Sequence, residues 1–194
     1  MAYQYVPTRL MLPTSRYSKS RADHAVNFIS NARWWHQGHL EATEGSVIYY
    51  DFIEKKITEL REQFNIVEIG YDAWGAGQMR QNLEREGFTM VSIHQGFKSL
   101  TEPTKELYRL VVDKRLIHGG HPVLRWHFEN VTVESDAAGN IKPSKDKSEE
   151  KIDGAVATIM ALSRAVHAVA NPPKRSVYET RGIITIGDDD DFDW

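Results

Sequence analysis

The chain has 194 residues, of which 41% are hydrophobic and 26% charged, and its formal net charge is −3 at pH 7. A chain of this length and composition can bury one good core, so we expect a single domain of ordinary size. It contains no Cys, which excludes disulfides, thiolate metal sites and Cys nucleophiles. No run approaches the roughly 18 apolar residues of a membrane span, and the start lacks a signal pattern, so we expect a soluble cytoplasmic protein.

The negative charge is concentrated at the carboxyl end. Residues 187–194 carry five acids, and removing these five charges from −3 leaves the rest of the chain at about +2. Such a balance permits a local DNA-binding patch but does not require one. We predict one domain over residues 1–170, followed by an extension over residues 171–194 with a flexible acidic tail.

The predicted elements alternate between strands and helices. In chain order they are an interrupted strand over 3–12, a mostly irregular stretch over 13–45 with some helix around 22–28, a helix over 51–64, a strand over 65–72, a helix over 76–86, a strand over 88–93, a helix beginning at Thr104, a strand over 116–118, a helix over 122–128, a strand over 131–133, a turn over 136–140 and a helix over about 149–168. This order is typical of an α/β layered fold, and we predict a central mixed, mainly parallel sheet flanked by helices.

The helices are predicted from apolar spacing and from end signals. Gly87 can end the second helix, and Thr104 can cap the third. The expected apolar faces are, in chain order, Ile53, Ile57, Leu60 and Phe64; then Leu107, Leu110 and Val111; then Ile152, Val156, Ile159, Met160 and Ser163.

Two acids lie where such a fold can carry chemistry. Asp72 closes the strand-like run 66–71, and Asp153 lies in the first turn of the last helix. Open α/β sheets bind ligands beyond the carboxyl ends of their strands, so Asp72 faces the predicted crevice. Two carboxylates placed in this way commonly build a divalent-metal site that cleaves phosphodiesters. Structural alternatives remain open, because Asp72 could cap a helix beginning near Trp74 and Asp153 could simply stabilise the helix dipole.

Seven segments around these acids resemble, in order and spacing, the C-terminal nuclease domain of tailed-bacteriophage terminase large subunits. The resemblance covers roughly residues 1–166. The segments are 69–74 (IGYDAW), 95–97 (QGF), 103–107 (PTKEL), 118–126 (HGGHPVLRW), 130–131 (NV), 136–143 (DAAGNIKP) and 151–154 (KIDG).

This resemblance implies a ribonuclease H-like fold that holds Mg²⁺ or Mn²⁺ and cuts concatemeric double-stranded DNA during genome packaging, in the cytoplasm of a bacterial host. Asp72 matches the second acid of the family's metal cluster and Asp153 the third, so the resemblance makes both of them catalytic, metal-binding residues. It also implies the partners: duplex DNA, the terminase ATPase domain, the small terminase subunit and the portal.

The first acid of the family has no match here, and we expect its strand to lie upstream of Met1. No phosphate-binding G-x-x-x-x-G-K-[ST] loop occurs in the sequence, so the chain looks like a fragment without the ATPase motor. Two carboxylates can hold one ion weakly, but two ions less readily. The alternative is therefore a non-catalytic remnant, or a docking or DNA-binding module. A resolvase or transposase fits the fold but not the seven segments.

Basic residues near Asp153 are the candidate DNA contacts. They could grip phosphate, although a solvated loop is the alternative. These residues are Lys142, Lys145, Lys147, Lys151 and His118.

Other polar and aromatic residues have structural interpretations beside functional ones. His118 and His121 are three apart, but Gly119 and Gly120 between them favour a turn over a zinc site. Acids just before Asp153 could supply an auxiliary ligand, and the tryptophans favour packing over base stacking. The acids are Glu149 and Glu150, and the tryptophans are Trp34, Trp35, Trp74 and Trp126.

Overall fold

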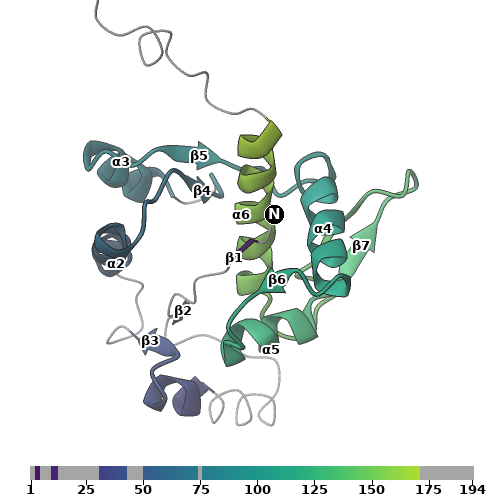
Figure 1. Cartoon of the computed structure of the whole chain (residues 1–194), viewed down its shortest axis with the longest axis horizontal. Coiled ribbons are helices and arrows are strands. Elements are labelled where there is room, and N and C mark those ends of the chain that lie inside the picture. The colour runs from purple at the N-terminus through teal and green to yellow at the C-terminus, as the bar shows by residue number, and fades with distance from the viewer. Residues whose placement is uncertain (1–2, 5–9, 13–30, 43–49, 74–75, 171–194) are drawn as a thin grey trace, which may run out of the picture.

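The computed structural model describes residues 3–4, 10–12, 31–42, 50–73 and 76–170 (Figure 1). The predicted helix around 22–28 and the predicted acidic tail lie outside these residues. The elements are β1 Tyr3–Gln4, β2 Leu10–Leu12, β3 Leu40–Ala42, α2 Tyr50–Gln63, β4 Ile69–Tyr71, α3 Gly77–Arg85, β5 Met90–Ser92, α4 Phe97–Val112, β6 Leu116–Ile117, α5 Pro122–Asn130, β7 Val133–Ser135, β8 Ile141–Pro143 and α6 Asp153–Ala170. Residues 31–36 are also helical.

The strands of the described residues form four pairs. The pairs β1–β6, β2–β3 and β4–β5 are parallel, and β7–β8 is antiparallel. A mixed α/β fold with mainly parallel pairing is therefore confirmed. The pairs are not joined into one sheet among the described residues, so the single central sheet stays a prediction. None of the described helices is both long and apolar enough to cross a lipid bilayer.

The predicted βαβ unit is confirmed. β4 pairs in parallel with β5, with Ile69 opposite Met90, and α3 makes the crossover between them. Gly87 follows α3 with a φ of +84°, a left-handed conformation that favours glycine. Gly70 allows the close packing of this unit, because a Cβ there would lie 2.6 Å from Ile93 Cδ1.

The predicted start of α4 is wrong. The helix begins at Phe97, behind Gly96 as its N-cap, and runs through Pro103, so Thr104 is an interior residue. An interior proline removes a backbone hydrogen bond, but here its ring is buried on the same face as Leu100 and Leu107. Val111, predicted on the apolar face, is 48% exposed.

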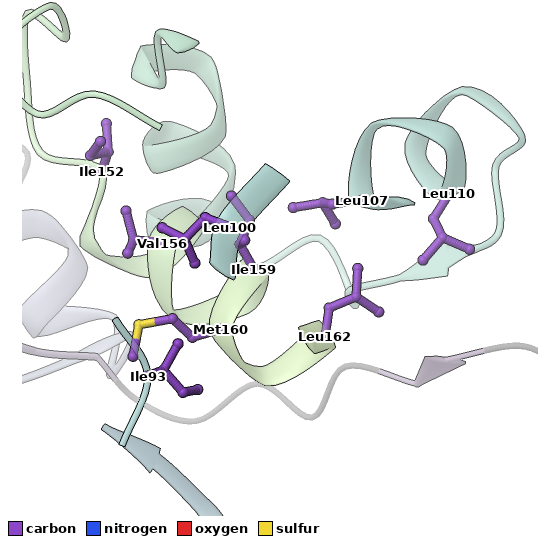
Figure 2. Close-up of a cluster of buried hydrophobic side chains, with 9 residues drawn as sticks. All are labelled: Ile93, Leu100, Leu107, Leu110, Ile152, Val156, Ile159, Met160 and Leu162. Atoms are coloured by element: carbon purple, nitrogen blue, oxygen red, sulfur yellow. The ribbon is translucent and has the colours of Figure 1, made fainter. Parts of the chain in front are cut away.

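Helix α6 is the centre of the fold. It contacts α4, α5 and β4, and Figure 1 shows it standing between α4 and the β4–β5 pair. Figure 2 shows its apolar side chains facing those of α4. The buried residues of this cluster are Ile93, Leu100, Leu107, Leu110, Ile152, Val156, Ile159, Met160 and Leu162. Each fully buried side chain of this kind stabilises the fold by roughly 1.5–3 kcal/mol, so α6 is held chiefly by its apolar face.

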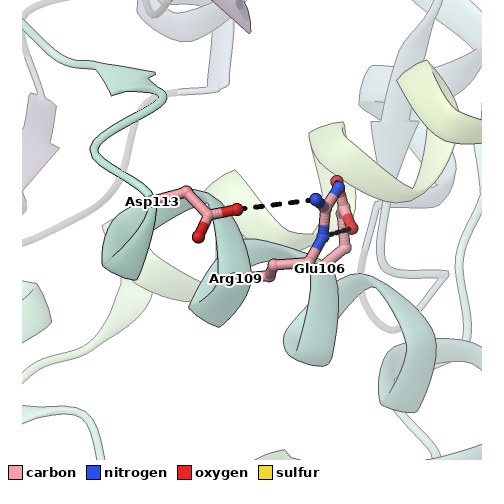
Figure 3. Close-up of polar contacts among 3 residues, drawn as sticks. All are labelled: Glu106, Arg109 and Asp113. Carbon is pink, nitrogen blue, oxygen red and sulfur yellow. Dashed lines mark hydrogen bonds and ion pairs between the residues drawn. The ribbon is translucent and has the colours of Figure 1, made fainter.

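The outer face of α4 carries charge instead. Arg109 donates to both carboxylate oxygens of Glu106, at 2.9 and 2.7 Å, and its Nη1 lies 3.6 Å from Asp113 (Figure 3). The Arg109 hydrogen bond lowers the pKa of Glu106. Because Arg109 is 54% exposed, water and salt screen these pairs. They keep this face solvated and contribute little to stability.

A half-buried ion pair ties the β4 unit to α6. Arg164, in the second half of α6, donates from Nε and Nη2 to the two carboxylate oxygens of Glu68 at 2.7 and 3.1 Å. Glu68 directly precedes β4, and the Arg164 hydrogen bonds lower its pKa. A bidentate guanidinium–carboxylate pair fixes orientation as well as distance, so this contact sets how β4 lies on the helix.

A buried histidine of α5 contacts the start of α6. His127 is 0% exposed, and its Nδ1 accepts a hydrogen bond from the backbone N–H of Gly154 at 2.9 Å. Burial lowers the pKa of His127 to about 4, against a smaller opposing effect of Asp153. The ring is therefore neutral at neutral pH, with Nδ1 as the acceptor.

We predict that the Glu68–Arg164 pair couples by about 1 kcal/mol in a double-mutant cycle of Glu68→Gln and Arg164→Met. The exposed pair Arg80–Glu84 of α3 is the matched control, and its coupling should stay near 0.3–0.5 kcal/mol. The measurement is urea unfolding at pH 7. Because the pKa of Glu68 is lowered, its contribution should be present above about pH 4.5 and fade as the pH falls further. Equal coupling in both pairs would contradict the tethering role.

We also predict that stability falls with acid because of His127. Between about pH 6.5 and pH 4 the unfolded chain binds a proton at this ring that the folded chain does not, so the free energy of unfolding falls as pH drops through that range. Above about pH 6.5 the contribution is complete. The total loss is about 3 kcal/mol. Urea unfolding of wild type and His127→Asn at pH 7.5, 6 and 5 measures it, and an unchanged slope in the variant would refute the assignment.

Candidate metal and nucleic-acid site

Asp72 lies directly after β4, where the sequence places it. The residue is half-buried, and its Oδ2 accepts a hydrogen bond from Gln95 Nε2 at 2.8 Å. Gln95 follows β5, the parallel partner of β4. The carboxyl ends of the two strands thus meet and bring both side chains together, as expected for the ligand-binding edge of an α/β sheet. Gln95 lies in the matching segment 95–97, but the sequence analysis predicted no role for it.

The capping interpretation of Asp72 is wrong. Helix α3 begins at Gly77 behind Ala76, and no side chain caps it. Asp72 therefore lies outside the helix and has no orphan N–H of that helix to satisfy. Its carboxylate is oriented by Gln95, a neutral donor that leaves the negative charge of Asp72 in place.

Asp153 is the first residue of α6, which begins later than the predicted Glu149. The carbonyl of Ile152 accepts the first helical bond from the Val156 N–H at 3.0 Å. The carboxylate lies at the positive end of the helix dipole, and its side chain is 45% exposed. Lys145 Nζ lies 3.0 Å from Asp153 Oδ1. Asp153 thus has one charged neighbour and an open side toward solvent.

Carboxylates accompany three of the predicted DNA-binding lysines. Lys142 lies opposite Glu134 in the β7–β8 pair and contacts it at 2.7 Å, while Lys147 lies 4.0 Å from the same carboxylate. Lys145 pairs with Asp153. The Lys142 hydrogen bond lowers the pKa of Glu134. A bound phosphate would have to compete with these carboxylates, so the DNA-binding role of these lysines, of Lys151 and of His118 stays a prediction.

The β7–β8 hairpin reaches both ends of the candidate site. Lys142 Nζ lies 5.3 Å from the centroid of the Phe97 ring, at the start of α4, and Phe97 follows Gln95 by two residues. Three residues after Lys142, Lys145 contacts Asp153. Three contacts and the short stretches of chain between them thus link the two acids. Their predicted separation of roughly 4–8 Å between carboxylate oxygens, the span of one shared ion, stays a prediction.

The donor set is suited to a hard cation but is small. Carboxylate oxygens are what Mg²⁺ and Mn²⁺ bind, and Asp72 and Asp153 supply them. Within the described part of the chain, no three Asp, Glu or His residues gather into a group that could hold a metal. Glu149 and Glu150 therefore do not complete such a group. The residues fit one weakly held ion better than a two-ion site.

The histidines at the start of α5 have structural roles. His118 Nδ1 accepts from the Gly120 N–H at 3.2 Å, and His121 Nδ1 caps α5 through the Leu124 N–H at 3.4 Å. Gly119 and Gly120 have φ values of +62° and +71°, which confirms the predicted turn. The backbone thus occupies one ring nitrogen of each histidine, which disfavours zinc.

Two neighbouring residues of α5, Trp126 and His127, have packing and hydrogen-bonding roles. Trp126 packs on Trp34 with ring centroids 5.5 Å apart, in agreement with the packing interpretation. His127 was missed by the sequence analysis, although it directly follows the matching segment 118–126. No local pattern signals its contact with Gly154, since 27 residues separate the two.

Comparison with known proteins gives the family. The family model described as "Terminase large subunit, endonuclease domain" matches residues 3–168. The large terminase subunit of Enterobacteria phage HK97 is 34% identical over 134 residues, which are 68% of this chain and 27% of that protein. Protein YmfN of Escherichia coli K12 is 34% identical over 137 residues, which are 69% of this chain and 30% of that protein.

Solved structures agree on the fold. The crystal structure of the HK97 bacteriophage large terminase matches with a TM-score of 0.69 and 29% identity, covering 79% of this chain and 32% of that one. The large terminase nuclease from thermophilic phage G20c matches with a TM-score of 0.50 and 12% identity, covering 62% and 64%, which bears on fold alone. The chain spans under a third of the two relatives named above, and it belongs to the endonuclease-domain family of terminase large subunits.

Proposed function

We propose that this chain is a divalent-metal-dependent endonuclease domain that cleaves concatemeric double-stranded DNA during phage genome packaging. The observation that carries the proposal is the placement of Asp72 at the joined carboxyl ends of β4 and β5 and of Asp153 at the start of α6, within a family of endonuclease domains. We infer that the strand pairs belong to a ribonuclease H-like sheet, with β4 and β5 at its ligand-binding edge.

In this proposal Asp72 and Asp153 hold Mg²⁺ or Mn²⁺. When bound, the ion supplies charge stabilisation at the phosphodiester that is cut. Gln95, a neutral donor, would help to orient the Asp72 carboxylate toward the ion through its hydrogen bond to Oδ2. Lys145 pairs with the Asp153 carboxylate, so it would compete with a cation for that carboxylate. With a cation bound there, Lys145 would be available as a phosphate contact beside Lys142 and Lys147.

The wider setting follows from the family. We propose that the chain acts in the cytoplasm of a bacterial host, as a domain over residues 1–170, together with a terminase ATPase domain, a small terminase subunit and the portal. The second candidate is a docking or DNA-binding module without catalytic activity. It is favoured by one observation, the absence of a three-residue metal group among the described residues.

We predict that the chain binds Mn²⁺ and that Asp72→Asn and Asp153→Asn each weaken binding about tenfold or more, because each removes one charged ligand. Plasmid cleavage should be weak with Mg²⁺ and stronger with Mn²⁺, which binds the same oxygens more tightly, and should be lost in both variants. Isothermal titration and gel assays measure these effects. Asp51→Asn, at an exposed acid of α2, is the control for charge alone. Mn²⁺ binding without cleavage would favour the docking module, and cleavage retained in both Asn variants would refute the site.

We predict that duplex binding is independent of sequence and falls steeply with salt, since the candidate contacts are lysines facing phosphate. Changing Lys142, Lys145 and Lys147 together to Ala should reduce the slope of log K against log salt by up to about 3. Fluorescence anisotropy from 50 to 200 mM salt measures the slope. The matched control changes three exposed basic residues elsewhere, Lys55, Arg85 and Lys114, to Ala. Equal slopes in the two triple variants would show that Lys142, Lys145 and Lys147 are not part of the DNA-binding surface.

A further inference from the structure

The start of α6 lacks a cap of its own. Ile152 occupies the N-cap position, because its carbonyl accepts the first helical bond. A helix begins with N–H groups that have no partner inside the helix, and a polar N-cap side chain ordinarily accepts one of them. Ile152 has no polar atom and is 2% exposed, packed in the core. The acceptor for the first turn must therefore come from elsewhere in the fold.

His127 supplies that acceptor from α5. Its Nδ1 accepts the N–H of Gly154, the second residue of α6, at 2.9 Å. This is the kind of donor that an N-cap oxygen would take. The ring is fully buried, so the bond is shielded from competing water. One long-range hydrogen bond thus replaces a local cap.

The contact is shaped around a glycine. A Cβ at position 154 would collide with His127 Nδ1 and would lie 3.2 Å from Leu124 Cδ1. The absence of a side chain lets the imidazole approach the helix backbone directly. Gly154 is unfavourable in a helix by about 1 kcal/mol relative to Ala, and the close approach of His127 accounts for a glycine at this point.

The imidazole has no other polar partner among the described residues. With Nδ1 as the acceptor, the ring proton lies on Nε2, and Nε2 is buried without a hydrogen-bond partner. An unpaired buried donor costs roughly 1–3 kcal/mol, a cost that an apolar side chain would avoid. The hydrogen bond from Gly154 is thus the interaction that accounts for a polar ring at this buried position.

We propose that His127 is a positioning residue for Asp153, the candidate metal ligand, and this inference rests on the proposed function. The N–H of Gly154 belongs to the rigid peptide plane that follows Asp153. Holding that N–H fixes the plane, and with it the direction in which the Asp153 side chain leaves the helix. Metal sites require ligands held to within about 0.5 Å, whereas uncapped helix ends fray. His127 does not contact substrate, because it is fully buried.

The test compares His127→Asn with His127→Leu. Asn and Leu have the same branched shape, so they leave similar space where the ring was, but only Asn offers an oxygen near the position of Nδ1. We expect His127→Leu to weaken Mn²⁺ binding about tenfold, in the range found for residues that orient metal ligands. We expect His127→Asn to keep the affinity within about threefold of wild type. Circular dichroism and thermal unfolding establish that both variants fold.

A second readout needs no metal. Hydrogen exchange of the Gly154 amide, followed by NMR, should be slow in wild type and in His127→Asn and at least about tenfold faster in His127→Leu, because only the last lacks an acceptor. Equal Mn²⁺ affinity of wild type and His127→Leu, with Asp153→Asn still impaired, would overturn this inference alone. Equal losses in the Asn and Leu variants would also overturn it, since they would show a packing role. No Mn²⁺ binding by wild type would overturn the proposed function itself, and the metal role of His127 with it.

Discussion

The burial of α6 is the constraint on which the rest of the structure depends. The helix packs its apolar face on α4 and also contacts α5 and β4, yet its first residue must present a charge to solvent. Burial close to a helix start normally leaves unpaired N–H groups in an apolar environment, which is costly. At the start of α6, His127 of α5 accepts one of these N–H groups. Toward the other end of the helix, Arg164 pairs with Glu68. Both acids of the candidate site belong to elements held by these contacts.

Lysines near the candidate site are already paired with carboxylates. The hairpin brings Lys142 to Glu134 and Lys145 to Asp153. The side chains of the Lys145–Asp153 pair are 59% and 45% exposed. A pair of this exposure contributes little to stability, typically 0–1 kcal/mol, so it holds Lys145 near the site without binding it strongly there. An anion or a cation of higher charge can therefore separate such a pair at small cost. In the proposed function, the lysine of such a pair would move from its carboxylate to phosphate when a metal ion binds.

The sequence predicted what depends on local pattern. The β4–α3–β5 unit, the turn ended by Gly139 and the position of Asp72 follow from apolar spacing and from glycines at turn positions, which act over a few residues. It failed at α4, because Thr104 was predicted to cap the helix, and only tertiary packing shows that the buried ring of Pro103 is accepted inside it. It also failed at His127 and Gln95. Their partners, Gly154 and Asp72, lie 27 and 23 residues away, and no periodicity reports a contact of that range.

The two acids differ in how they are held, and this difference assigns them different parts in the proposed reaction. Gln95 is a neutral donor, so in the proposed site its hydrogen bond to Asp72 would not have to break when a cation binds, as is usual for partners behind metal ligands. Lys145 cannot stay on Asp153 in the same way, because its charge repels the cation that would share the carboxylate. In the proposed function, Asp72 would therefore keep its partner when a cation binds, whereas Asp153 would exchange its partner. The Lys145 ammonium lies on a long flexible side chain with three donors. If a metal ion took its place on Asp153, Lys145 would be available to contact the anionic backbone of DNA.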